Sequence, residues 1–225
     1  MADSIVLVSG GMDSAVTAAI AVLEGTAAFL HINYGQRTEA RELKAFNAIA
    51  ESCGVRERLV VDISYLKKIG GSALTDSAIE VPEGDLSRKG VPSTYVPFRN
   101  ANFLSIAVSW AEVIAAKNIY IGAVEEDSSG YPDCREAFFT AFEKAANLGK
   151  KPGSDIKIIT PLIHLRKADI VKKGLELKAP LHLTWSCYRD ETLACGECDS
   201  CLLRLRGFSE AGAKDPIPYR QKAAL

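Results

Sequence analysis

The chain has 225 residues, 48% of them hydrophobic, and a formal net charge of -1 at pH 7, which suits one well-packed core with a small appendage. The balanced charge argues against a broad nucleic-acid-binding surface. No apolar run is long enough to span a membrane and no basic-then-apolar leader opens the chain, so we expect a cytoplasmic protein.

The first predicted element is a strand over residues 5–8, which runs into the hexapeptide S-G-G-M-D-S at 9–14. Four consecutive β-branched or leucine residues favour a strand buried on both faces of a parallel sheet. The glycines allow a sharp turn close to a ligand, and the small residues that follow predict a tightly packed helix. Such a turn favours phosphate binding, because free N–H groups and the positive end of the helix dipole converge there.

The carboxylate of Asp13 would repel phosphate unless a divalent cation lay between them. Mg²⁺ suits that place, because it prefers oxygen ligands and is commonly bound together with substrate phosphates. The hexapeptide lacks the lysine of a G-x-x-x-x-G-K-[ST] loop. It resembles instead the pyrophosphate loop of the N-type ATP pyrophosphatases, which adenylate a carbonyl oxygen and release pyrophosphate. The alternative is a glycine-rich connector in an ordinary α/β fold.

As a pyrophosphate loop, this stretch would supply the catalytic candidates Asp13 and Ser14. The candidate ATP contacts are Val8, Ser9, Gly10, Gly11, Met12, Asp13, Ser14, Ala15, Val16, Thr17 and Ala18.

Strands and helices alternate along the next part of the chain. Strands over 27–33 and 58–63 flank a helix over 38–53, which predicts right-handed crossovers and a doubly wound parallel sheet. Ligands bind beyond the carboxyl ends of the strands in such sheets. We therefore add His31, Tyr34 and Gln36 to the ATP-binding candidates, although a histidine on an apolar strand is more often a satisfied core or nucleotide-packing residue than a general base.

Residues 70–97 contain three prolines and no clear periodicity. A segment of this length is either a functional flap or poorly ordered, and we favour a flap that orders on binding or on subunit contact. The remaining predicted elements are a helix at 98–117, a strand at 118–123, a helix at 135–148, a strand at 156–159 and a helix at 167–178. We expect an α/β domain over 1–180, with the segment 181–225 packed on it.

An acidic loop at 124–133 follows the fourth predicted strand. Its carboxylates are Glu125, Glu126, Asp127 and Asp133. A solvated loop is the simpler interpretation, but its position places it at the same sheet edge as the phosphate loop. A guanine-type edge has two parallel N–H donors, which one carboxylate accepts in a bidentate pair. The sequence leaves open which carboxylate does so.

Arg99 lies near the start of the long predicted helix. It is a candidate partner for phosphate or for a substrate carboxylate. The alternative is a surface arginine.

Four of the six cysteines crowd into residues 187–201 with the spacing C-x7-C-x2-C-x2-C. In a reducing compartment, this density favours metal binding over disulfides. Four thiolates make a closed tetrahedral set that leaves no position for substrate, which is typical of structural sites. We predict a zinc site, with an iron–sulfur cluster as the main alternative and unligated buried cysteines as the other. The predicted ligands are Cys187, Cys195, Cys198 and Cys201.

These motifs together resemble the 7-cyano-7-deazaguanine synthase family of queuosine biosynthesis, nearly from end to end. One departure is Phe98, where glycine or alanine is expected in much of the family, and Val124-Glu125 also differs from the expected asparagine. The matching motifs are S-G-G-M-D-S at 9–14, Y-G-Q-R at 34–37, Y-V-P-F-R-N at 95–100, G-Y-P-D-C-R at 130–135, T-W-S-C-Y at 184–188 and C-G-E-C-D-S-C at 195–201.

The resemblance implies an ATP-dependent ligase that converts 7-carboxy-7-deazaguanine and ammonia into 7-cyano-7-deazaguanine (preQ0) through adenylated intermediates. It implies ATP with Mg²⁺ as co-substrate, one structural Zn²⁺ per chain and a homodimer, without direct contact to nucleic acid or membrane. Arg99 becomes a catalytic candidate as well. The substrate-binding candidates are Arg99, Glu126, Asp127, Tyr131 and Asp133.

Two other functions are weighed against this one. A tRNA-thiolating or tRNA-lysidine relative would need a basic RNA-binding surface, and thiolation also needs an exposed sulfur-carrying cysteine. A non-catalytic nucleotide sensor would have little use for Asp13 or for a second, acidic pocket. No glutaminase domain is recognisable and the chain starts with Met-Ala rather than cysteine, so free ammonia is the expected nitrogen source.

Overall fold

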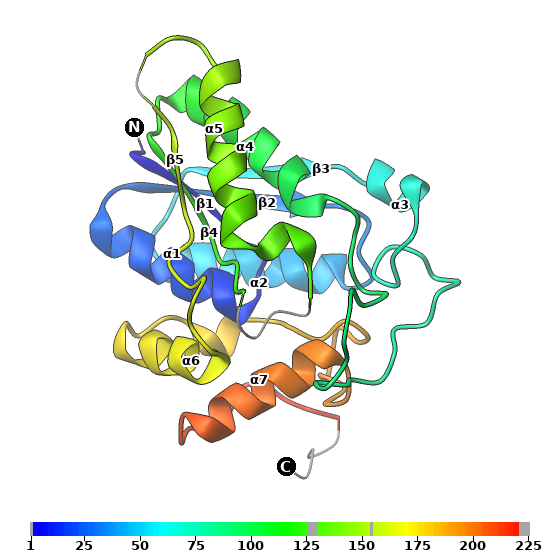
Figure 1. The fold of residues 1–225 in the computed structure, drawn as a ribbon. Coiled ribbons are helices and arrows are strands. Elements are labelled where there is room, and N and C mark those ends of the chain that lie inside the picture. Colours follow the sequence, from blue (N-terminus) through cyan, green and yellow to red (C-terminus); the bar gives the residue numbers. More distant parts are fainter. Residues whose placement is uncertain (1, 126–129, 154, 221–225) are drawn as a thin grey trace.

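The computed structural model describes residues 2–125, 130–153 and 155–220. Its centre is a parallel sheet with the strand order β3-β2-β1-β4-β5 (Figure 1). β1 pairs with β2 on one side and with β4 on the other. The strand order therefore reverses at β1, the kind of switch point where open α/β sheets bind ligands. The strands are β1 Ser4–Leu7, β2 Ala27–Asn33, β3 Arg58–Asp62, β4 Asn118–Ile121 and β5 Lys157–Ile159.

Helices cover both faces of this sheet. Figure 1 shows α1 and α2 on one face and α4 and α5 on the other, while α6 and α7 pack together beyond α1. The predicted doubly wound α/β fold is confirmed. The helices are α1 Met12–Glu24, α2 Glu39–Ser52, α3 Tyr65–Ile69, α4 Arg99–Ile114, α5 Glu136–Gly149, α6 Lys167–Glu176 and α7 Asp199–Glu210, with short 3-10 turns at Pro132–Cys134 and Leu181–Leu183.

β1 is buried on both faces, as its composition predicts. Ile5 and Leu7 belong to the core beneath α4, whereas Val6 and Val8 belong to the core beneath α1 and α2. Each side chain of this kind stabilises the fold by roughly 1.5–3 kcal/mol when it is fully buried. β1 therefore joins the two apolar layers and fixes the position of the loop that follows it.

The segment 70–97 contains no helix or strand, in agreement with its lack of periodicity. Arg37 fixes its first part: Nε donates to the Ala73 carbonyl (2.7 Å), and Nη2 donates to the carbonyls of Asp76 (2.9 Å) and Ile79 (2.7 Å). These three hydrogen bonds to one guanidinium tie the first part of the flap to the loop between β2 and α2.

The short α3 and the longer α7 were not predicted from the sequence. α7 contains Cys201 and Gly207, and its buried face contacts α6 rather than the sheet. Among the described helices, none has the length and apolar character needed to cross a lipid bilayer.

Both ends of α4 have a non-glycine residue with a left-handed backbone conformation. Phe98, which precedes α4, has φ 56°, and Ala115, which ends the same helix, has φ 57°. This conformation costs a residue with a Cβ roughly 1–2 kcal/mol and favours glycine. The backbone therefore gives a reason to expect glycine at position 98, where the side chain of Phe98 is 60% exposed.

We predict that Ala115→Gly stabilises the protein by about 1 kcal/mol, because glycine adopts the left-handed conformation without strain. Ala145→Gly is the matched control. Ala145 is exposed inside α5, where glycine should instead destabilise by about 1 kcal/mol. Urea unfolding of the three proteins measures both effects, and destabilisation by Ala115→Gly would contradict the first prediction.

Candidate functional site

A cavity of about 280 Å³ lies at the carboxyl ends of β1, β2 and β4. Leu7, Leu30 and Ile121 line it from the three strands. The rest of the wall comes from the phosphate-loop candidate at 9–14, the start of α4 and segments from the C-terminal part of the chain. The cavity therefore lies at the predicted sheet edge, on the switch point beside β1.

The loop at 9–14 passes directly into the N-terminus of α1. Gly11 is the residue that precedes the helix, and no side chain caps this end. The first-turn N–H groups have no intrahelical acceptors in any α-helix, so here they can donate to a ligand. The hydroxyl of Ser14 donates to the Gly11 carbonyl (2.9 Å) and lies 3.2 Å from the hydroxyl of Ser9. This arrangement suits an anion.

Two glycines allow the backbone segments around this loop to approach each other. A Cβ at Gly10 (φ 92°) would lie 2.6 Å from the backbone oxygen of Glu42, and one at Gly122 would lie 2.9 Å from the carbonyl carbon of Asp13. Gly122 was missed in the sequence analysis. Its only signal was its position directly after a predicted strand.

Asp13 bonds to Lys167, a residue that the sequence analysis did not select. Nζ of Lys167, at the start of α6, bonds to Oδ2 of Asp13, and the ion pair is mostly buried. Oδ1 of Asp13 is buried and has no hydrogen-bond partner within the described residues. One carboxylate oxygen thus remains for a cation, which fits an Mg²⁺ that takes its other ligands from phosphate and water. Lys167 also supplies the positive charge that the hexapeptide lacks.

Arg99 lines the cavity, so the surface alternative is wrong. Nη1 donates to the hydroxyl of Tyr34 (3.0 Å), and the guanidinium lies over the rings of Tyr34 (5.2 Å) and Phe103 (5.7 Å). Its Nε is buried and has no acceptor among the described residues. A planar cation held on aromatic faces with a donor to spare is suited to bind a carboxylate or phosphate.

Glu42, in the first turn of α2, is a second cavity residue that the sequence analysis missed. Oε1 accepts a hydrogen bond from the Thr38 hydroxyl (2.8 Å), and Oε2 accepts one from Nε2 of Gln36 (3.2 Å). Burial raises the pKa of Glu42 to about 7, although these two hydrogen bonds act in the opposite direction.

Most of the ATP-binding candidates fall into two groups by position. Val8, Ser9, Gly11, Met12, Asp13, Ser14 and Tyr34 line the cavity. Ala15, Val16, Thr17 and Ala18 are fully buried on the packed face of α1.

His31 and Gln36 lie behind the cavity wall. The ring of His31 packs on Phe46, with Nδ1 2.9 Å from the Val8 carbonyl oxygen, and burial lowers its pKa. Oε1 of Gln36 accepts a hydrogen bond from the backbone N–H of Tyr34 (2.9 Å). Both side chains therefore support residues that line the cavity.

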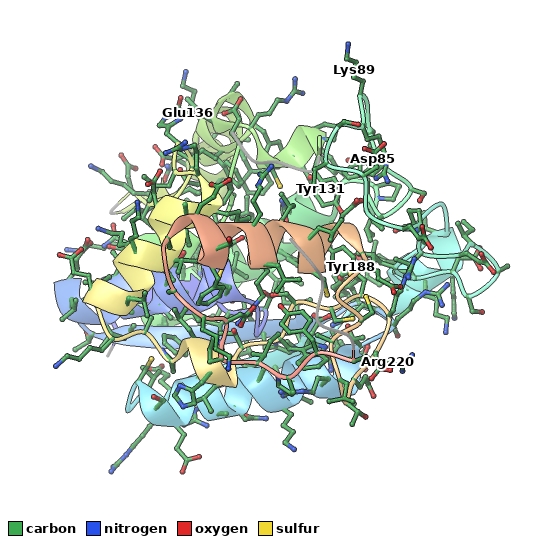
Figure 2. The ribbon with its side chains drawn as sticks, turned by 90° about the horizontal axis from the view of Figure 1, so that it is seen from below. Asp85, Lys89, Tyr131, Glu136, Tyr188 and Arg220 are labelled. Carbon is green, nitrogen blue, oxygen red and sulfur yellow. The ribbon has the colours of Figure 1, made fainter. Side chains whose placement is uncertain are left out.

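The substrate-binding candidates of the acidic loop also differ in position. Tyr131 lines the cavity, and Figure 2 places it and Tyr188 beside the N-terminal end of α7. Asp133 is buried beneath α4, where its Oδ2 accepts a hydrogen bond from the backbone N–H of Asn100 (2.9 Å). Glu126 and Asp127 lie outside the described residues.

The two cysteines outside the cluster are partly buried. Cys53 ends α2 and packs against the core beneath it. Cys134 lines the cavity, and burial raises its pKa to about 11, so it is a neutral thiol rather than a nucleophilic thiolate at neutral pH.

The four clustered cysteines form a compact, buried group. Their sulfur atoms all lie within 4.8 Å of one another, and each residue is at most 7% exposed. Backbone N–H groups of Arg189 and Cys195 donate to the sulfur of Cys187, at 3.4 and 3.3 Å. Such bonds stabilise metal-bound thiolates. The cluster can hold a metal ion in a closed site, as the spacing predicts.

The second part of the flap is fixed to the segment that carries this cluster. The backbone N–H of Gly84 donates to the Glu197 carbonyl (2.7 Å), and Arg88 pairs with Asp199 (2.7 Å). Asp199 also accepts a hydrogen bond from the backbone N–H of Asp85 (2.8 Å). Figure 2 shows Lys89 pointing outward from the flap, away from these contacts.

The sheet is doubly wound and parallel, and a glycine turn and an open helix N-terminus lie at its switch point. These features place the chain in the class of α/β proteins that bind phosphate-bearing ligands. The family model described as Queuosine biosynthesis protein QueC matches residues 3–212, and the chain belongs to this family. The expected family is thereby confirmed.

Several relatives of high similarity carry the name 7-cyano-7-deazaguanine synthase. One from Chlorobium phaeobacteroides is 57% identical over 220 residues, which cover 97% of each chain. One from Koribacter versatilis is 57% identical over 225 residues, which cover 98% of this chain and 94% of the relative. Among solved structures, an NH3-dependent NAD synthetase from Campylobacter jejuni matches with a TM-score of 0.47 and 13% identity, over 80% of this chain and 66% of the other.

We predict that Glu42→Gln stabilises the protein more at pH 8 than at pH 5. The pKa of Glu42 in the folded chain, about 7, lies above its ordinary value of 4.5. The folded state therefore binds the proton more tightly, and the stability of the wild type falls as pH rises from about 4.5 past 7. Glutamine carries no charge to desolvate. Unfolding midpoints at both pH values measure the difference, with Glu51→Gln, an exposed position on the same helix, as control.

We also predict that Cys198→Ala loses bound metal and stability together. Removal of one thiolate from a closed four-thiolate site should lower the unfolding midpoint by on the order of 10 °C. Cys53→Ala, outside the cluster, should keep its metal. Elemental analysis and thermal unfolding test this, and a stable variant with full metal content would refute the four-thiolate site.

Proposed function

We propose that this chain is an ATP-dependent ligase that forms 7-cyano-7-deazaguanine from 7-carboxy-7-deazaguanine and ammonia, in queuosine biosynthesis. One observation carries the proposal: a single cavity contains an open helix N-terminus, suited to phosphate, and Arg99, suited to a carboxylate. The family to which the chain belongs supports the identity of the substrate.

The reaction requires the same activation twice. The substrate carboxylate attacks the α-phosphorus of ATP, which releases pyrophosphate and gives an acyl adenylate. Ammonia attacks the acyl carbon, and AMP leaves with the oxygen, which gives the amide and a proton. The amide oxygen then attacks a second ATP, pyrophosphate leaves, and loss of AMP and protons from the imidate gives the nitrile. Both activations place AMP on an oxygen that must leave, so one site serves for both.

The phosphate loop and Lys167 would hold the part of ATP that leaves. The first-turn N–H groups of α1 would donate to pyrophosphate, and Lys167 adds a positive charge. The hydroxyls of Ser9 and Ser14 would donate to it only after turning away from their present acceptors, which are the Ser14 hydroxyl and the Gly11 carbonyl. Asp13 orients Lys167 through Oδ2 and offers Oδ1 to Mg²⁺. When bound, Mg²⁺ neutralises negative charge that develops on the phosphates. Stabilisation of this charge by fixed groups is the main contribution to catalysis.

Arg99 would bind the carboxylate of the deazaguanine, with Tyr131 on the same wall. Asp133 acts more distantly, because it holds the start of α4 and thereby positions Arg99. We also propose that Glu126 and Asp127 contribute to substrate binding.

The remaining assignments concern the whole molecule. We propose that residues 1–180 carry the ATP chemistry and that 181–225 brace the cavity through one structural Zn²⁺ on Cys187, Cys195, Cys198 and Cys201. Free ammonia is the proposed nitrogen source. The enzyme is proposed to act in the cytoplasm as a homodimer.

Mass spectrometry of products tests the function. The protein is incubated with ATP, Mg²⁺, ammonium and 7-carboxy-7-deazaguanine. We expect the amide and then the nitrile, with AMP and pyrophosphate accumulating together. Formation of ADP and orthophosphate, without AMP at any stage, would overturn the proposed chemistry.

Asp13→Asn should fold normally but form AMP at least about 100-fold more slowly, because an amide neither neutralises Lys167 nor holds Mg²⁺ as a carboxylate does. Asp155→Asn, at an exposed carboxylate, is the matched control and should retain full activity. A near-normal rate for Asp13→Asn would show that Asp13 does not take part in adenylation.

A further inference from the structure

The proposed substrate has a base edge that none of the described residues assigned above recognises. A deazaguanine presents two adjacent donors, N1–H and the 2-amino group, beside its 6-oxo acceptor. A single ionised carboxylate matches the two donors, because each of its oxygens accepts one hydrogen bond. The described wall of the cavity contains three carboxylates, those of Asp13, Glu42 and Asp199.

Two of these carboxylates are already bound to cations. Asp13 bonds to Lys167 at the phosphate end of the cavity. Asp199 forms a salt bridge with Arg88 (2.7 Å) and accepts a hydrogen bond from the backbone N–H of Asp85 (2.8 Å). Both groups hold parts of the chain in place, so neither has a free pair of oxygens to offer.

Glu42 differs from both. It forms no salt bridge with any described residue, and each of its oxygens accepts one hydrogen bond, from Thr38 and Gln36 respectively. A carboxylate oxygen can accept two hydrogen bonds. One acceptor position therefore remains on each oxygen of this carboxylate at the cavity wall. Two N–H donors would compensate the desolvation that this group suffers.

The surrounding groups suit a flat base with a carboxylate at its other end. Gln36 joins Glu42 to the backbone of Tyr34, and the hydroxyl of Tyr34 in turn contacts Arg99. The rings of Tyr34 and Phe103 pack at 5.6 Å and also line the cavity. The acceptor pair of Glu42 and the cation of Arg99 are thus connected through Gln36 and Tyr34, and the Arg99 guanidinium lies over the rings of Tyr34 and Phe103.

We propose that Glu42 reads the donor edge of the deazaguanine ring, one oxygen accepting from N1–H and the other from the 2-amino group. This inference rests on the proposed function and names its specificity-determining residue. Adenine does not fit the same carboxylate, because its 6-amino donor lies beside the N1 acceptor, which a carboxylate repels. Glu42 therefore distinguishes the deazaguanine from the adenine of ATP.

Binding measurements without ATP turnover test the inference. The dissociation constant of 7-carboxy-7-deazaguanine, and of the same acid without its 2-amino group, is measured by calorimetry at pH 8. The proteins are the wild type, Glu42→Gln, Glu42→Asp and the control Glu51→Gln, which removes the same charge from an exposed position of α2. Near-UV circular dichroism confirms that each protein is folded.

Glu42→Gln should weaken binding of the full substrate by about 10- to 100-fold, because a charged acceptor of the 2-amino group is lost. The analogue without that group should lose much less, so the preference for the 2-amino group should collapse. Glu42→Asp, whose carboxylate is one methylene shorter, should also weaken binding of the full substrate. Glu51→Gln should bind as the wild type does, and the KM for ATP should change by less than about two-fold in all variants.

Three results would overturn the inference. Equal losses for the two ligands would mean that Glu42 does not contact the 2-amino group, and unchanged binding would mean that it contacts neither donor. A rise in the KM for ATP with unchanged binding of the acid would place Glu42 at the adenine instead. These outcomes differ from failure of the proposed function itself, in which the wild-type protein binds neither acid.

Discussion

The close contact between the first turn of α1 and the backbone of Gly122 is the constraint on which the rest of the site depends. A side chain at position 122 would occupy the space of the Asp13 carbonyl, and one at Gly10 would meet the backbone of α2. Glycine at both positions lets three backbone segments converge at the end of β1. The helix N-terminus therefore lies over the switch point of the sheet, where an anion meets several N–H groups at once. A displacement of α1 would disturb the loop, the Asp13–Lys167 pair and the neighbouring part of α2 together.

The site contains groups that the fold would be more stable without. Glu42 is a desolvated carboxylate that forms no salt bridge with a described residue, and its pKa is raised to about 7 in spite of the attraction of Arg99. Nε of Arg99 and Oδ1 of Asp13 are buried without hydrogen-bond partners there. Such groups cost free energy in the empty protein. Their concentration at one cavity is the pattern expected where ligand atoms supply the missing partners, and it illustrates the trade between stability and function.

The sequence was sufficient for the fold class, for the position of most elements and for the four-cysteine cluster, because periodicity and short spacings are local signals. The phosphate loop also gave a local signal, because its six residues are consecutive in the sequence. Lys167 and Glu42 were missed for the opposite reason: each lies within a helix of ordinary composition, and only the packing of α6 and α2 brings it to the loop. His31 and Gln36 were placed on the correct edge of the sheet, but their side chains turn toward the backbone behind the wall. Sequence patterns locate an element more reliably than they locate the direction of one polar side chain.

The C-terminal part of the chain completes the same cavity that the first fifteen residues begin. The backbone N–H of Trp185 donates to the Gly10 carbonyl (2.8 Å), and Trp185, Ser186 and Tyr188 line the cavity together with Val8 and Ser9. An exchange of the C-terminal segment between homologues would thus also exchange one wall of the binding site. It would replace Glu197 and Asp199 as well, which the flap contacts. Chimaeras joined near residue 180 therefore need both segments from one parent if this wall is to be kept.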